Sequence, residues 1–239
     1  MNANVRWQEL ISENLAAASV PGARKQDISF SAVEAGMPAG QLGAGGERFV
    51  MPSARAAINF SQGEINPTGV NTDMAIEGPG IFQIQLPDGN TAYTRDGEFH
   101  LNAQGQLTSK RGYAIASDSG GPIQMDPNNS APIAVSSGGQ VSQGGEVRGS
   151  IKLVEFKDPN ALKVIGQGYF IKNSQDDKAV DSPTSSVRQG YLEGANTTPT
   201  VEMSSLITAM RMFESNEKVL QMQDDRMGKV ISDLGGTGA

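Results

Sequence analysis

The residues from Pro199 to Leu234 form a helical pattern that is long for a chain of this size. Apolar residues recur three and four positions apart, and no proline or glycine interrupts the pattern before Gly228. The positions at this spacing are Met203, Leu206, Met210, Phe213, Leu220, Met227, Ile231 and Leu234. We therefore predict one continuous helix of roughly 50 Å, whereas the mean helix has only about 11–12 residues.

The predicted C-terminal helix is apolar on more than one side. Two acidic residues, Glu217 and Asp224, interrupt the main seam. Further apolar residues lie away from the seam, at Met212, Val219, Met222 and Val230. A helix of this kind needs more than one packing partner. Those partners are either the remainder of its own chain or other subunits, and the pattern is compatible with both.

A shorter helix is predicted near the other end of the chain, from Val5 to Ala18. Its apolar residues at helical spacing are Val5, Trp7, Leu10, Ile11 and Leu15. Pro21 restricts Val20 to extended backbone and Gly22 supplies a flexible exit, so the helix ends before them. The two terminal helices are explained most simply if they pack on each other.

Between the helices, from Ser29 to about Gln189, the pattern indicates β-structure. Turn signals recur roughly every 8–12 residues, and the runs between them alternate with the period of a strand, as in Ile81–Leu86 and Ile151–Phe156. Gly36–Gly46 is predicted to be a flexible loop or a hairpin tip. The predicted fold class is α+β, with helices at both ends and an antiparallel all-β central body.

The composition excludes several classes of function. The 26 acidic and 19 basic residues give a net charge of −7, which argues against nucleic-acid partners and anionic membrane surfaces. Without cysteine there is no disulfide and no cysteine-based metal site. No apolar run reaches about 18 residues, so we expect no membrane insertion. The N-terminus also lacks the basic and apolar regions of a cleavable signal peptide.

Few residues are arranged for catalysis. His100 is the sole histidine, and strand alternation accounts for it without a second metal ligand or a triad partner. Gly43–Gly46 lacks the Lys-Ser/Thr pair of a phosphate-binding loop, and Asp126–Asn129 lacks the spacing of a calcium loop. We therefore predict no catalytic, cofactor-binding or metal-binding residues, and a chain that is not an enzyme.

Three segments of the chain resemble the bacterial flagellar rod and hook proteins, in that family's order. The first is NLAAASVPGARKQ at residues 14–26, in which the matching positions are Asn14, Leu15, Ala16, Ser19, Pro21, Gly22 and Arg24. The second covers residues 60–115 and includes the runs QGEINPTG and YTRDGEF. The third covers residues 190–231 and begins GYLEGAN. Together they cover most of the chain.

The resemblance implies a structural subunit of the flagellar basal-body rod, a helical assembly that crosses the periplasm and transmits torque from motor to hook. In that family the terminal helices form a coiled-coil-like inner domain. The implied domains are residues 1–22 (N-terminal helix), 23–70 (extended arm or β-hairpin), 71–190 (β-rich outer domain) and 191–239 (return segment and long helix). The implied partners are other copies of the chain, neighbouring rod proteins and the flagellar type III export apparatus, which exports without a cleaved signal.

The resemblance also implies roles for individual residues. Pro21 and Gly22 would form a hinge between the inner helix and the extended arm. Packing between subunits is expected of Leu10, Ile11, Asn14, Leu15, Ala18, Met203, Leu206, Met210, Phe213, Leu220, Met227 and Ile231.

Within the family, the runs Ala18–Gly22 and Met210–Glu214 favour the proximal rod, with the distal rod as the alternative. A less favoured alternative is a peptidoglycan-associated accessory or hydrolase. Its catalytic acid would be one of Glu64, Asp73, Asp88 or Asp96.

Overall fold

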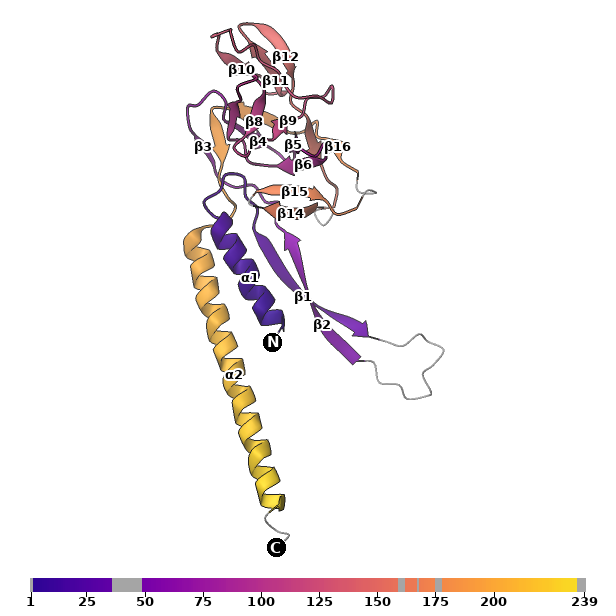
Figure 1. The fold of residues 1–239 in the computed structure, drawn as a ribbon, viewed down its shortest axis with the longest axis vertical. Helices are drawn as coiled ribbons and strands as arrows, with labels where there is room; N and C mark the ends of the chain where they lie inside the picture. Colours follow the sequence, from indigo (N-terminus) through magenta and orange to yellow (C-terminus); the bar gives the residue numbers. More distant parts are fainter. Residues whose placement is uncertain (1, 36–48, 159–161, 167, 175–177, 236–239) are drawn as a thin grey trace, which may run out of the picture. The chain divides into compact units, whose positions relative to one another are not determined.

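The computed structural model describes residues 2–35, 49–158, 162–166, 168–174 and 178–235, drawn in Figure 1. The predicted loop Gly36–Gly46 lies outside these residues. The helices are α1 (Asn2–Ala17) and α2 (Pro199–Gly235), which confirms both predicted helices. The strands are β1 (Gln26–Ala35), β2 (Phe49–Ile58), β3 (Ile65–Pro67), β4 (Met74–Glu77), β5 (Ile81–Gln85), β6 (Thr91–Thr94), β7 (Phe99–Leu101), β8 (Leu107–Ser109), β9 (Ala114–Ile115), β10 (Ile133–Val135), β11 (Gln140–Gln143), β12 (Glu146–Ser150), β13 (Leu153–Glu155), β14 (Leu162–Gly166), β15 (Tyr169–Lys172), β16 (Val180–Asp181), β17 (Ser186–Gln189) and β18 (Tyr191–Glu193).

The chain forms two compact units. One, here called the terminal unit, consists of residues 1–13, 28–56 and 200–239. The other, here called the β unit, consists of residues 14–27 and 57–199. The chain therefore passes between the units at four points along the sequence. None of the helices in the described part of the chain is long and apolar enough to cross a membrane.

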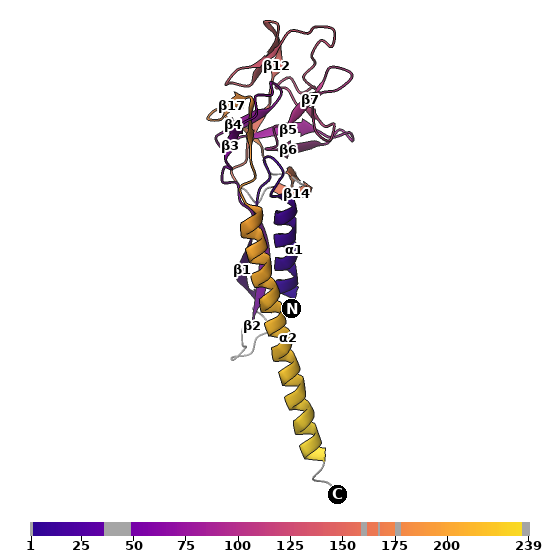
Figure 2. The same cartoon turned by 90° about the vertical axis from the view of Figure 1, so that its left-hand side faces the viewer.

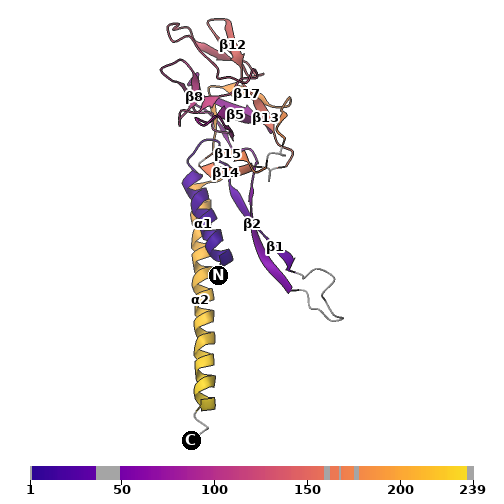
Figure 3. The ribbon, with the colours of Figure 1, turned by 45° about the vertical axis from the view of Figure 1, so that its right-hand side comes forward.

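Within the terminal unit, α1 and the first part of α2 run side by side in all three views (Figures 1, 2 and 3). Leu10 and Ile11 are buried on α1, and Glu202 and Ala209 are buried on α2. The buried α2 positions are seven residues apart, which places them on one face of the helix. The side chains of residues 214–229, farther along α2, are all exposed.

The β unit is built from antiparallel strands, as the alternating pattern predicts. Its largest sheet has nine strands, with the order β14-β15-β6-β5-β9-β8-β7 and with β13 and β16 joined at its side. A second sheet contains β10, β11 and β12, and two-stranded pairs join β17 to β4 and β18 to β3. These strands pair in antiparallel fashion.

The core of the β unit lies on both faces of β5. Phe82 packs in a cluster with Phe99, and the two rings meet edge to face at 5.2 Å. Its neighbour Ile81 points to the opposite face and packs in a cluster with Tyr93. Burial on both faces explains why the β5 sequence, IFQIQ, is more apolar than a strand with one solvated face.

Candidate functional site

The segments that carry the family resemblance meet at one place in the β unit. We call this place the junction and define it as Asn14 and residues 20–26, 59–63, 95–97 and 193–196. Each of these ranges lies within the β unit, beside or between the points where the chain leaves it. The junction is held by backbone contacts, by one buried charge cluster and by two asparagine side chains.

A tight turn brings the chain from the end of α1 into the junction. The amide of Val20 donates to the carbonyl of Ala17, and the amide of Ala23 donates to the carbonyl of Val20. Gly22 adopts a φ of 67° and its amide donates to the carbonyl of Glu193 at 2.7 Å. A Cβ atom on Gly22 would overlap the carbonyl carbon of Arg95, so a side chain is excluded here both by φ and by space.

The carboxylate of Glu193 is the centre of the charge cluster. Its Oε1 accepts from Nη2 of Arg24 at 2.6 Å and from the amide of Gly63 at 2.8 Å. Its Oε2 accepts from Nη1 of Arg95 at 2.9 Å. The side chains of Arg24 and Glu193 are fully buried and that of Arg95 is 3% exposed. One carboxylate therefore joins three segments that are far apart in the sequence.

Arg95 also connects the charge cluster to the backbone at the end of β4. Its Nη1 also donates to the carbonyl of Ile76 at 3.1 Å, and its Nη2 donates to the carbonyl of Gly78. These acceptors lie at the end of β4 and just after it. Through Arg95, the charge cluster is thus anchored on the backbone that leads into β5.

The charge cluster contains two cations and one anion. Burial lowers the pKa of Arg95 to about 10; the negative charge of Glu193 opposes that shift and the positive charge of Arg24 adds to it. Within the described part of the chain, Nε and Nη1 of Arg24 and Nε of Arg95 are buried without a hydrogen-bond partner. Glu193 is therefore the group whose loss would be most costly, since it would leave two buried guanidinium groups without a counter-charge.

Two asparagine side chains form hydrogen bonds with backbone groups of the junction. Oδ1 of Asn196 accepts from the amide of Lys25 at 2.7 Å, and its Nδ2 donates to the carbonyl of Asn59 at 2.7 Å. Asn14 pairs with the backbone of Gln26 in both directions, at 2.9 Å each. The segments before β1, after β2 and before α2 are thereby held together by side-chain amides that replace missing backbone partners.

Asp96 is a buried acid next to the turn at Gly22. Its Oδ1 accepts from the amide of Glu98 at 3.0 Å. Burial raises the pKa of Asp96 to about 6, and the nearby negative charges of Glu98 and Asp73 add to this shift. Asp96 is therefore a junction residue whose charge changes near pH 6.

The structure brings only part of the predicted packing and hinge residues into the junction. Asn14, Pro21 and Gly22 lie there. Elsewhere, Leu10 and Ile11 are buried, Leu15, Ala18, Leu206 and Phe213 are half-buried, and Met203, Met210, Leu220 and Met227 are exposed. The side chain of Ile231 lies outside the described residues. Sequence reasoning missed Arg95, Glu193 and Asn196 as site residues, although all three lie in segments that carry the resemblance.

Two of the four acids considered for a hydrolase, Asp73 and Asp96, lie near each other. Glu64 and Asp88 are exposed, and Asp88 caps its own turn by accepting from the amide of Asn90 at 3.0 Å. Asp73 and Asp96 are buried. Among the residues that the structure describes, no group of three or more histidine or acidic side chains is placed to hold a metal ion. His100 is exposed on β7, and its Nε2 lies 3.3 Å from the hydroxyl of Thr108.

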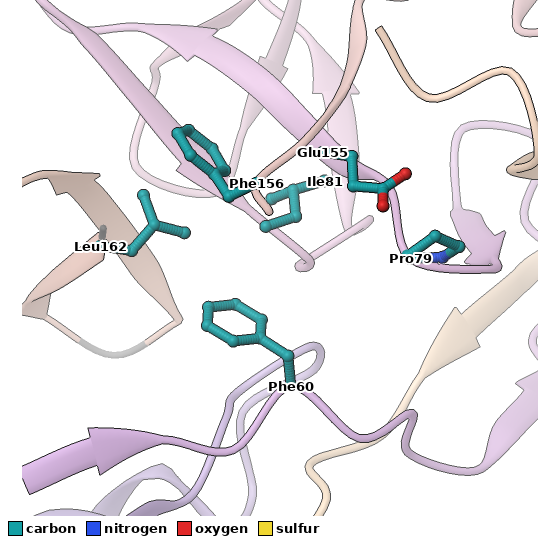
Figure 4. A pocket seen from close by; sticks show the side chains of 6 residues that line it. All are labelled: Phe60, Pro79, Ile81, Glu155, Phe156 and Leu162. Atoms are coloured by element: carbon teal, nitrogen blue, oxygen red, sulfur yellow. The ribbon is translucent and has the colours of Figure 1, made fainter. Parts of the chain in front are cut away.

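A small apolar pocket in the β unit includes Phe60 of the junction in its lining (Figure 4). Its volume is about 90 Å³, and it is lined by Phe60, Pro79, Ile81, Glu155, Phe156 and Leu162. The one carboxylate, on Glu155, already accepts from the hydroxyl of Ser182 at 3.2 Å. Pockets for small molecules are typically about 300–1,000 Å³ with several convergent polar groups, so this one offers little to a ligand.

Two family models match two of the segments that form the junction. Residues 75–143, which include Arg95, match the family described as "Flagellar hook protein FlgE/F/G D1 domain". Residues 188–234, which include Glu193, match "Flagellar basal body rod FlgEFG protein C-terminal". The two matches therefore cover the segments of Arg95 and Glu193 in the charge cluster, and Arg24 lies outside both.

Similar proteins extend along nearly the whole chain. The flagellar basal-body rod protein FlgG of Buchnera aphidicola subsp. Schizaphis graminum is 32% identical, over 92% of this chain and 91% of its own length. FlgF of Caulobacter vibrioides is 32% identical, over 96% of this chain and 92% of its own. FlgG of Bacillus subtilis is 30% identical, over 94% of this chain and 92% of its own length. At these identities and coverages, the chain belongs to the family of flagellar basal-body rod proteins.

Proposed function

We propose that this protein is a structural subunit that assembles helically into the flagellar rod and transmits torque from motor to hook. Its partners are other copies of the chain and neighbouring rod proteins. The observation that carries this proposal is the apolar surface of α2, which the chain by itself leaves exposed. Family membership supports the proposal, since the relatives are named as basal-body rod proteins.

The mismatch in length between the two helices accounts for this surface. α1 has 16 residues and α2 has 37, which at about 1.5 Å per residue correspond to roughly 24 Å and 55 Å. Beyond the first part of α2, Leu220 is 42% exposed, Met222 is 54% exposed and Met227 is 64% exposed. Fully burying a side chain of this size contributes about 1.5–3 kcal/mol, so contact with neighbours would be favourable.

In the assembled rod, the terminal helices would form the coiled-coil-like inner domain. The predicted packing residues Met203, Met210, Leu220 and Met227 would then contact helices of other subunits. Methionine suits such contacts because its flexible thioether adapts to neighbours that are not identical. Glu217 and Asp224 interrupt the seam and would select one register at a cost in stability.

The junction supports the same function from within the chain. A subunit that transmits torque must connect its assembling helices to its body without a loose link. The four segments that leave the β unit are held by buried charges and paired amides. Pro21 and Gly22 serve this proposal as the turn that connects α1 to the arm.

Within the rod, we assign the chain to the proximal part, with the distal part as the alternative. The runs Ala18–Gly22 and Met210–Glu214 favour the proximal assignment. Delivery through the flagellar type III apparatus, without a cleaved signal, and a position in the periplasm complete the proposal.

The proposal is tested by placing a charge on the exposed face of α2. Leu220→Asp and Met227→Asp should leave the thermal unfolding of the dilute chain unchanged, because both side chains are already exposed. The same changes should abolish swarming and rod recovery when introduced into a strain that lacks the native gene. Gln221→Asp is the matched control, since it adds the same charge to an exposed position between them. Normal rods with Leu220→Asp and Met227→Asp would contradict the proposal.

A further inference from the structure

The four passages between the two units flank the segments that carry the charge cluster and its partners. The first passage, between residues 13 and 14 within α1, lies about ten residues before Arg24, and β1 begins two residues after Arg24. The third passage, between residues 56 and 57 near the end of β2, leads to Gly63, whose amide donates to Glu193. The passage into α2 follows Asn196, which lies three residues after Glu193. The carboxylate of Glu193 contacts the segment between the first two passages through Arg24, and the segment after β2 through the amide of Gly63.

We propose that Glu193 is a positioning residue for rod assembly. Its carboxylate holds together, within the β unit, the segments from which the chain continues into α1, β1, β2 and α2. This inference rests on the proposed function, because it concerns how a folded subunit becomes competent to assemble. It assigns to Glu193 a role in the geometry of the subunit that differs from a role in stabilising its core.

The kind of contact that the charge cluster makes supports this separation of roles. Arg24, Arg95 and Glu193 are held by hydrogen bonds to one another and to backbone groups, whereas the core clusters are held by packing of apolar side chains. A buried ion pair contributes little net stability compared with apolar residues of the same volume, because desolvation offsets the attraction. Its geometry is demanding, however, because each buried polar atom requires a partner at a defined place.

The arrangement of partners makes the carboxylate hard to replace. Oε1 and Oε2 each accept a charged hydrogen bond, from Arg24 and Arg95 respectively. A glutamine at this position has one oxygen and one NH₂ group, and the NH₂ group would face a guanidinium that is also a donor. One of the two arginines must then move, and the segment that it holds moves with it.

The first experiment compares Glu193→Gln with a destabilised control variant at matched folded fraction. Val141→Ala removes buried apolar volume from the core cluster, away from the junction, and lowers stability by a different route. The two full-length variants are compared at temperatures chosen so that equal fractions are folded. Hydrogen exchange is read at residues 20–26 and 59–63, and assembly is read as motility and rod recovery in a strain that lacks the native gene.

We expect exchange at residues 20–26 and 59–63 to accelerate by about 100-fold or more in Glu193→Gln only, since removing one partner breaks a buried ion pair. Assembly should fall at least about tenfold relative to Val141→Ala at equal stability. Equal assembly of the two variants would overturn the inference, and so would normal assembly of Glu193→Gln. Failure of the wild-type chain itself to restore rods would instead overturn the proposed function.

A second variant keeps the test decisive if Glu193→Gln does not fold. Arg24→Gln removes one of the two cations, so the charges of Glu193 and Arg95 still balance in the core. We expect this variant to fold, to show fast exchange at residues 20–26 and to lose assembly. A folded Arg24→Gln chain that assembles as well as wild type would overturn the inference.

Discussion

Nη2 of Arg24 lies 2.6 Å from Oε1 of Glu193, although the two residues are 169 positions apart in the sequence. Both side chains are fully buried. The contact joins the first segment of the β unit to its last, and Arg95 joins the same carboxylate from the middle of the chain.

Removing the carboxylate should cost more stability than removing one arginine. Glu193→Leu leaves two buried cations, and we expect a loss of about 3–5 kcal/mol in the free energy of unfolding. Arg24→Met leaves the Glu193–Arg95 pair in place and should cost less than half as much. Urea denaturation of both single variants and of the double variant measures the difference. If the double variant loses as much free energy of unfolding as the two single variants lose together, the two residues are not coupled.

Gly22→Ala should destabilise the junction strongly. Alanine is unfavourable at the φ of 67° that this position adopts, and its Cβ would also overlap the backbone of Arg95. We therefore expect a loss of more than about 2 kcal/mol in the free energy of unfolding. Gly89→Ala is the matched control, because Gly89 has a similar φ of 81° with open space around it. That control carries only the backbone cost of about 1 kcal/mol. Equal losses in thermal or urea unfolding would show that the overlap at Gly22 is relieved at little cost.

Asp96 should make stability fall as the pH rises from about 4 to about 6. Its folded pKa of about 6 lies above the ordinary value of 3.8, because burial disfavours the charged form. The folded chain therefore holds the proton more tightly than the unfolded chain does. The stability linked to this proton is fully present below the unfolded pKa and is lost as the pH rises through the folded pKa. The difference between the two pKa values corresponds to roughly 3 kcal/mol in the free energy of unfolding.

Asp96→Asn removes this titration and keeps an oxygen that can accept from the amide of Glu98. We expect the free energy of unfolding at pH 7 to rise by about 1–3 kcal/mol, and its slope between pH 4 and pH 6 to flatten. Urea denaturation across that range is the measurement. Asp88→Asn serves as the control, since Asp88 lies in an exposed turn and its pKa is lowered by the amide of Asn90. An unchanged slope in Asp96→Asn would assign the pH dependence to another group.

Oxidation of methionine should distinguish the surface of α2 from the core. Met210, Met222 and Met227 are about half or more exposed, whereas Met74 and Met125 are 1% exposed. Dilute hydrogen peroxide should convert the first group to sulfoxides at least about tenfold faster, because the thioether must be accessible. In isolated rods, the α2 methionines should become protected. Equal oxidation of these residues in rods and in the dilute chain would contradict packing between subunits.

Local periodicity was sufficient to predict the helices and the class of the central body. The spacing of apolar residues from Pro199 onward predicted α2 nearly to its ends, and the pattern from Val5 to Ala18 predicted most of α1. Strand alternation in Ile81–Leu86 predicted β5. These features are set by neighbours within a few residues, so they can be read along the chain.

The charge cluster could not be predicted in this way. In the sequence, Glu193 is an acid between a strand and a loop, and most such acids are solvated. Arg95 follows a strand and resembles a residue at an exposed turn. That all three charges are buried together follows from the pairing of β18 with β3 and from the docking of the turn at Gly22. Neither is determined by residues adjacent to the charges.

The helices, the antiparallel strands and, through the resemblance to rod proteins, the family can be predicted from the amino-acid sequence. The site formed by Arg24, Arg95 and Glu193, and the bonds of Asn14 to the backbone of Gln26, are seen only in the folded chain. The difference lies in the range of the interactions. Helix and strand periods are short-range and repeat along the chain, whereas a buried ion pair exists only where folding has brought distant residues together and removed water from them.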